Sequence, residues 1–185
     1  DEVVAALVDG SGWTKGVAQD LDFATGINSA ELAAFIGQTQ VDEWDKWSKG
    51  FPDADAAQVG FRKRVAQEID ARGTIDVLRN GVKGNGCKFF LCTFRPAHGL
   101  TPLLTERYEA NRLTVTRQQR YAAAHNNTLD IVLWVNGLAV VTVELKNPLT
   151  GQSVEDAMTQ YRTDRTPTDL IFRRRALVHF AVDPH

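Results

Sequence analysis

Residues 128–145 read TLDIVLWVNGLAVVTVEL and are the most informative stretch of the chain for its architecture. Two runs rich in β-branched residues flank Asn136-Gly137, a dipeptide that favours the tight turn of a β-hairpin. Both runs are apolar at nearly every position, so each face of this hairpin should be covered by other parts of the protein. The stretch therefore predicts an antiparallel strand pair inside a covered sheet.

The flanking sequence indicates helices and further strands around this hairpin. Asn28-Ser29-Ala30-Glu31 has the cap pattern of a helix start, and apolar residues at four-residue steps predict a longer helix over 55–72 that ends at Gly73. Short helices are expected near 101–111 and after Ser153, and extended segments are expected at 74–78, 87–94, 113–121 and 176–182. The last segment should be a buried strand, and the first thirty residues should be rich in loops. Helices around a mixed sheet place the chain in the α/β class, with α+β as the neighbouring alternative.

Length and composition fit one globular domain over residues 1–185. The chain has 21 basic and 23 acidic residues, and 43% of its residues are apolar. No run approaches the roughly 18 apolar residues of a membrane helix, and no secretion signal is recognisable, so we expect a cytoplasmic protein. Because the chain begins at Asp1 without a methionine and stops in a strand-like run, we expect a fragment of a longer protein.

The two cysteines are expected to be small buried residues. Cys87 and Cys92 are five positions apart, which places them on opposite faces of a strand and argues against a disulfide between them. No histidine pair lies nearby to complete a metal site.

Two carboxylates and a lysine at the strand ends are the first candidate for chemistry. Asp130 lies at the start of the first strand, and Glu144 and Lys146 lie at the end of the second. Their spacing alone is a weak signal, but both ends adjoin apolar runs, where a buried charge is unfavourable unless it is paired or bound to a metal. The alternative is a structural network of the same three side chains.

The register of the hairpin tests whether the two carboxylates can share a site. A two-residue turn at Asn136-Gly137 with regular pairing would place Asp130 and Glu144 on opposite faces of the sheet. A three-residue loop over 135–137, with Gly137 left-handed, would place both on one face. We therefore predict the three-residue loop, or another irregularity of one residue.

Such a site would support metal-assisted hydrolysis. Asp130, Glu144 and the backbone carbonyl of Leu145 are hard oxygen ligands suited to Mg²⁺. The metal would polarise a phosphate and acidify a bound water, while Lys146 would hold that water or offset developing negative charge.

Other motifs point less clearly to function. Residues 81–86 (GVKGNG) have the glycine spacing of a phosphate-binding loop but lack the Lys-Ser/Thr that should follow, so we expect a turn. The four histidines show no ligand spacing, and His179 is expected to be a packed, hydrogen-bonded residue. Arginines and lysines cluster at 62–64, 112–120, 162–165 and 173–175, which fits either a phosphate backbone or solvated surface.

Four segments carry a resemblance to a known family. They read NRLTVTRQQRY at 111–121, TLDIVLWVNGLAVVTVELKNPLTGQ at 128–152, EDAMTQYRTDR at 155–165 and VHFAVD at 178–183. These segments closely resemble the N-terminal nuclease domain of the restriction (R) subunit of type I restriction-modification enzymes. The similarity continues through RGTIDVLRNGVK at 72–83 and extends over nearly the whole chain.

This resemblance implies a restriction-endonuclease-like fold, a mixed sheet flanked by helices that carries the PD-(D/E)xK nuclease motif. The motif transfers to Asp130, Glu144 and Lys146 as catalytic residues, with Mg²⁺ as the cofactor. The fold usually has a further acid on a preceding helix, for which Glu68 is favoured as a metal ligand and Glu31 is the alternative.

The family also has a glutamine followed four residues later by a tyrosine on the helix after the core strands. Gln160 matches, but the position four residues later is Asp164, and the tyrosine here is Tyr161. The residues expected to contact DNA are Gln160, Tyr161, Arg162, Arg117 and Arg120.

The resemblance further implies the partners of the whole subunit. We expect double-stranded DNA as substrate, methyltransferase and specificity subunits as partners, no membrane, and a location in the bacterial cytoplasm. An ATP-driven translocase follows this domain in the family, so ATP would be bound by the full-length subunit and not by this fragment. The expected enzyme is thus the endonuclease domain of a type I site-specific deoxyribonuclease. One alternative is a catalytically silent module of the same fold that binds DNA or docks subunits, and another is a free-standing repair or recombination nuclease.

Overall fold

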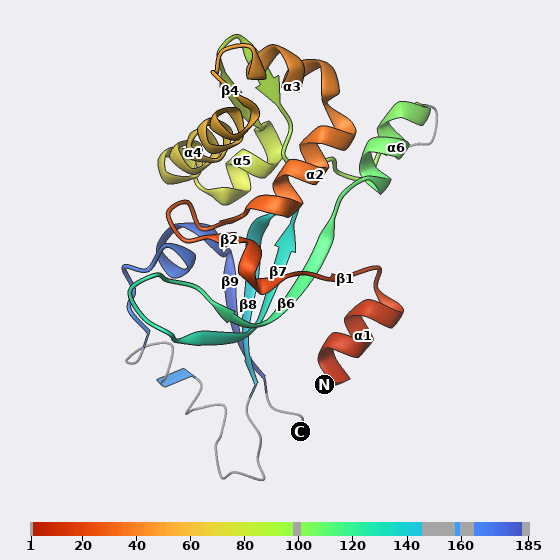
Figure 1. Cartoon of the computed structure of the whole chain (residues 1–185). Coiled ribbons are helices and arrows are strands. Elements are labelled where there is room, and N and C mark those ends of the chain that lie inside the picture. The colour runs from red at the N-terminus through yellow and green to blue at the C-terminus, as the bar shows by residue number, and fades with distance from the viewer. Residues whose placement is uncertain (1, 98–100, 146–157, 160–164, 183–185) are drawn as a thin grey trace.

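The computed structural model describes residues 2–97, 101–145, 158–159 and 165–182 (Figure 1). Its helices are α1 (Glu2–Gly10), α2 (Ser29–Thr39), α3 (Val41–Ser48), α4 (Ala54–Arg72), α5 (Thr74–Asn80) and α6 (Pro102–Glu109), with helical turns η1 (Ala18–Asp20) and η4 (Ile171–Arg175). Its strands are β1 (Thr14–Lys15), β2 (Leu21–Asp22), β3 (Ile27–Asn28), β4 (Val82–Gly84), β5 (Cys87–Phe89), β6 (Leu113–Arg120), β7 (Thr128–Val135), β8 (Leu138–Leu145) and β9 (Val178–Val182).

A mixed sheet with an antiparallel centre forms the larger part of the molecule. β6, β7 and β8 are hydrogen-bonded in sequence order within the arrangement β1-β6-β7-β8-β3-β2. β1 runs parallel to β6. Two strands share the outer edge of β8: β3 pairs with its first residue, Leu138, next to the hairpin turn, and β9 runs parallel to its second half. The α/β class with a mixed sheet is therefore confirmed.

The central hairpin turns at Asn136-Gly137 and then contains one extra residue. Asn136 (φ 51°) and Gly137 (φ 84°) are both left-handed, and Val135 pairs with Leu138, so the turn has two residues. The predicted three-residue loop is wrong, because a two-residue turn of this sequence already matches the twist of the strands. The pairing shifts one step later, where Val140 is left without a partner.

This shift is the one-residue irregularity that the shared-site hypothesis requires. Beyond it Ile131 lies opposite Val143, and the same register brings Asp130 opposite Glu144. Both carboxylates therefore lie on the same face of the sheet.

Both faces of the hairpin are covered, as the sequence predicts. On the α1 side the core contains Val4, Val115, Ile131 and Val143. On the other side it contains Tyr121, Leu129, Val132, Trp134 and Ile171.

A second lobe of α2–α5 and the small hairpin β4–β5 lies beyond the turn end of the main hairpin (Figure 1). Its core includes edge-on aromatic pairs, with ring centroids 5.7 Å apart for Trp47 and Phe61 and 4.6 Å apart for Phe61 and Phe89. The predicted helix start at Asn28 is confirmed, since its side chain accepts from the Glu31 N–H at 3.2 Å. The predicted end of α4 at Gly73 is confirmed as well.

The segment 74–78, predicted to be extended, is helical. α5 buries Thr74, Val77 and Leu78, which have helical spacing and pack between the left-handed Gly73 and Gly81. β-branched residues favoured a strand locally, but burial against α4 determined the conformation. Within residues 81–86, Val82–Gly84 form β4 and Asn85-Gly86 make the tight turn to β5, so the expected turn is confirmed at the last two positions only.

Two further expectations are wrong, and one lies outside the described residues. The first thirty residues include helix α1, whose Val4, Leu7 and Val8 face the sheet at helical spacing. β9 is not buried, since Phe180 is 49% exposed and His179 is exposed while hydrogen-bonded to Thr142 at 2.6 Å. The strand has these exposures because it pairs with β8 alone at an edge. Most of the helix expected after Ser153 lies outside the described residues.

Both cysteines are free thiols, as expected. Cys87 is buried and Cys92 is half-buried, and burial raises the pKa of Cys92 to about 11, so neither favours a thiolate.

Candidate functional site

Asp130 is fixed at the start of β7 by contacts to both neighbouring strands. Its Oδ1 accepts from Gln118 Nε2 of β6 at 2.9 Å, and its Oδ2 accepts from the Leu145 N–H of β8 at 2.8 Å. Gln118 is left-handed (φ 45°), and its Oε1 accepts from Thr128 Oγ1 at 3.0 Å. The carboxylate is thus held in one orientation near the end of β8.

Glu144 is buried and paired with a buried arginine. Glu144 is 3% exposed, and its Oε1 accepts a hydrogen bond from Arg165 Nη2. Arg165 is 6% exposed and also donates to Tyr121 Oη at 3.1 Å and to the Thr128 carbonyl at 2.9 Å. Within the described residues its Nε has no partner. A cation therefore already neutralises this end of the site.

Burial raises the pKa of Glu144 to about 7, and the like charge of Asp130 adds to this, although Arg165 opposes it. Near neutral pH both the protonated and the ionised form of the Glu144 carboxyl are therefore populated. A bound cation would favour the ionised form, as it does for other metal ligands.

The donor set fits a hard divalent cation. Asp130 and Glu144 present oxygen atoms on one face, and the Leu145 carbonyl belongs to the same strand end. In the part of the chain that the structure describes, no three His, Cys, Asp or Glu side chains come together, so further ligands would be the carbonyl, water or a substrate phosphate.

Several predicted site residues lie outside the described residues: Lys146, Gln160, Tyr161 and Arg162. Of the predicted DNA contacts that are described, Arg117 is exposed on β6. Arg120 instead donates to the carbonyls of Ala122 (3.1 Å), Ala123 (2.8 Å) and His125 (2.8 Å), so its guanidinium holds the loop before β7.

Neither upstream glutamate joins the two carboxylates. Glu68 on α4 is ion-paired with Arg64 and, at 2.6 Å, with Arg72. Glu31 on α2 is paired with Arg112 at 2.6 Å, beside the hairpin turn. Asp130 lies six residues from that turn, roughly 20 Å along the strand. The structure therefore does not support a metal-ligand role for Glu68 or for Glu31.

The sequence did not identify three residues of this network: Gln118, Tyr121 and Arg165. Gln118 could have been found by extending the strand pairing. In β6 and β7, Arg117 pairs with Ile131 and Gln119 with Leu129, so Gln118 lies opposite Asp130. Arg165 is visible in the sequence only as one of several clustered arginines, and its pairing with Glu144 depends on the tertiary fold.

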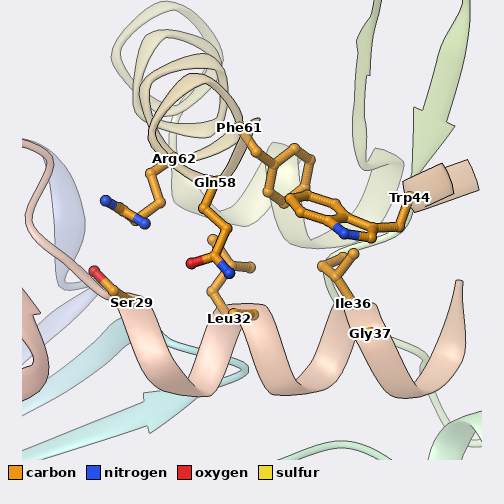
Figure 2. Close-up of a pocket in the computed structure, with 9 residues that line it drawn as sticks. Ser29, Leu32, Ile36, Gly37, Trp44, Gln58, Phe61 and Arg62 are labelled. Atoms are coloured by element: carbon orange, nitrogen blue, oxygen red, sulfur yellow. The ribbon is translucent and has the colours of Figure 1, made fainter. Parts of the chain in front are cut away.

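A separate pocket of about 370 Å³ lies between α2, α3 and α4 (Figure 2). Figure 2 shows its walls, formed by Leu32, Ile36, Trp44 and Phe61, with Ser29, Gln58 and Arg62 at one end. Its lining includes no carboxylate, histidine or cysteine, so it lacks the groups that hydrolysis needs.

Residues 102–182 match the family described as the N terminus of the type I restriction enzyme R protein. The resemblance stated from the sequence is confirmed over this segment, which contains Asp130, Glu144 and Arg165. No curated protein and no solved structure matches the chain, so no structural neighbour supports the restriction-endonuclease-like fold that the resemblance implies. None of the described helices combines the length and apolarity needed to cross a bilayer.

Proposed function

From the match of residues 102–182 to the N terminus of type I restriction enzyme R proteins, we propose that this chain is a Mg²⁺-dependent DNA endonuclease domain. The observation that supports it best is the shift at Val140, which brings Asp130 and Glu144 to one face at the end of β8. Bulges are over-represented near active sites, where they change the direction of side chains, and this one, four residues before Glu144, decides which face Glu144 shares.

Each side chain has a distinct part in this proposal. Bound Mg²⁺ would supply a polarised phosphate oxygen and an acidified water. Asp130, oriented by Gln118 and the Leu145 N–H, and Glu144 in its ionised form would hold the metal, and Lys146 would position the attacking water. Arg165 neutralises Glu144 when no metal is bound.

The rest of the family context is proposed with it. Double-stranded DNA would be the substrate, and methyltransferase and specificity subunits would be partners in a larger assembly. ATP would serve the translocase part of the whole subunit.

A second candidate function has its own observation. The closed ion pair of Arg165 and Glu144 fits a nuclease-like module that binds DNA or docks partners without cutting. In that case the carboxylate would serve only the fold.

Metal binding and nicking distinguish the two candidates. We would titrate the chain with Mn²⁺ by calorimetry and follow Mg²⁺-dependent nicking of supercoiled plasmid, using D130N, E144Q and K146A with the exposed D45N as control. The nuclease proposal expects wild type and D45N to bind and nick, D130N and E144Q to do neither, and K146A to bind without nicking. Absence of Mn²⁺ binding and of nicking in a folded wild-type chain would favour the silent module.

A further inference from the structure

A concave basic surface lies on the second lobe, outside the segment that matches the family. It is lined by α4, α5 and the β4–β5 hairpin, and Figure 1 shows these elements at the opposite end of the molecule from the end of β8. Five cations and one carboxylate line it: Arg64, Arg72, Arg79, Lys83, Lys88 and Glu68. The whole chain carries a net charge of −2, so positive charge is concentrated here.

The six charged groups fall into two sets. Arg64 and Arg72 both pair with Glu68, and Arg72 also pairs with Asp76. Each donates to a carbonyl as well, Arg64 to that of Lys83 at 2.8 Å and Arg72 to that of Gly81 at 2.7 Å. They form a fixed floor. Within the described residues, Arg79, Lys83 and Lys88 have no ion-pair partner, and all three are exposed.

Lys83 and Lys88 lie directly opposite each other on the two strands of the small hairpin. Like charges in this position destabilise a strand pair. Two carboxylates lie close by, and both are already paired: Glu68 with Arg64 and Arg72, and Glu43 with Lys46 at 3.0 Å. Glu43 also accepts the Lys88 backbone N–H at 3.3 Å. In the part of the chain that the structure describes, neither ammonium group therefore has an anionic partner.

An exposed aromatic ring adjoins the lysine pair. Phe90 is 40% exposed, and the Lys88 ammonium lies 4.6 Å from its ring centroid. Cations beside an exposed ring are the combination with which proteins hold nucleic-acid strands, because phosphates meet the charges and the ring offers a stacking or apolar contact.

We propose that this surface, formed by Arg79, Lys83, Lys88 and Phe90, binds the phosphate backbone of DNA apart from the carboxylate site. The inference rests on the proposed function for its choice of DNA as the polyanion. Backbone contacts carry no sequence information, so the surface should bind all sequences alike.

The test measures binding of a fluorescent DNA duplex by the whole chain in EDTA, which separates binding from cleavage. We compare wild type, K83Q/K88Q, R79Q and a matched double variant, K15Q/K63Q, which removes the same charge from exposed positions outside the surface. Loss of two phosphate contacts should weaken binding roughly tenfold to hundredfold at 0.1 M salt and lower the slope of log K against log salt by about two. R79Q, which removes one contact, should lower the slope by about one.

The outcomes are separable from those of the proposed function. Equal weakening in K83Q/K88Q and K15Q/K63Q would overturn the inference while leaving the nuclease proposal intact. If inorganic phosphate at constant ionic strength displaced the duplex, the surface would be a discrete phosphate pocket and the inference would also fail. A folded wild-type chain that binds no DNA in EDTA would overturn the inference, while the nuclease proposal is decided separately by Mn²⁺ binding and nicking. Mn²⁺ titration of K83Q/K88Q should match wild type in every case.

Discussion

Glu144 and Arg165 form an ion pair whose side chains are only 4% and 6% exposed. The other ion pairs of the described residues each have at least one side chain with substantially more exposure, as in Arg175 with Asp70 at 2% and 49%. The pair joins the end of β8 to the chain that follows it, and places a fixed positive charge beside the proposed metal ligands.

Removal of one partner of this pair should destabilise the fold. E144A leaves the Arg165 guanidinium buried without its counter-charge, which typically lowers the free energy of unfolding by about 3 kcal/mol or more. E144Q keeps an acceptor oxygen for Arg165 and should be more stable than E144A. Urea unfolding at pH 7 measures both, and equal loss in the two variants would show that the side-chain oxygen does not hold Arg165.

The pH dependence of stability should carry the signature of Glu144. Its pKa in the folded chain is about 7, above the ordinary value of 4.5, so its protonated form favours folding. That contribution is fully present below pH 4.5 and is lost as pH rises through 7, by up to about 3 kcal/mol. The free energy of unfolding of E144Q should therefore increase relative to that of wild type as pH rises from 5 to 8. The exposed variant E2Q should follow wild type over the same range; a parallel wild-type and E144Q profile would contradict the assignment.

Protonation of Glu144 should weaken metal binding, although it favours folding. Because Glu144 must be ionised to bind a cation, Mn²⁺ affinity should rise between pH 6 and 8 and then level off. Calorimetry in buffers of different ionisation enthalpy should also detect proton release on binding. Pairing with Arg165 would be the sole role of Glu144 if affinity were independent of pH.

Much of this arrangement could be predicted from local sequence. Turn chemistry and apolar periodicity predict the hairpin and the helix ends at Asn28 and Gly73. They also predict that Asp130 and Glu144 lie at strand ends. The need for a one-residue irregularity also follows, because strand side chains alternate with a period of two.

The remaining features depend on contacts between distant segments. The predicted position of the irregularity is wrong: Asn136-Gly137 keeps the two-residue turn that its own chemistry favours, and the extra residue is Val140, which no local pattern marks. Residues 74–78 are helical because of their packing on α4, which outweighs their strand propensity. The arginine that pairs with Glu144 is selected by the fold from several candidates within a few residues of one another.

Gln118 should act as a positioning residue for Asp130. Q118A removes the donor to Oδ1 and frees the carboxylate to rotate, so Mn²⁺ affinity should fall about 10- to 100-fold with little change in unfolding free energy. T128V, which removes the hydroxyl donor to Gln118, should have a smaller effect of the same sign. The exposed variant Q38A is the control, and unchanged affinity in Q118A would assign the orientation of Asp130 to the Leu145 N–H alone.

Charge reversal at Lys83 should move stability and DNA binding in opposite directions. K83E places a carboxylate opposite Lys88, replacing a repulsive cross-strand pair with an attractive one, so unfolding free energy should rise by about 0.5 kcal/mol. DNA affinity should fall further than in a neutral variant, because a phosphate now meets a like charge. Ordinary destabilisation would lower both quantities, and a purely structural hairpin would raise stability with binding unchanged. Thermal unfolding and duplex titration of the same K83E preparation, with K15E as the matched control, therefore distinguish a DNA-binding role from either alternative.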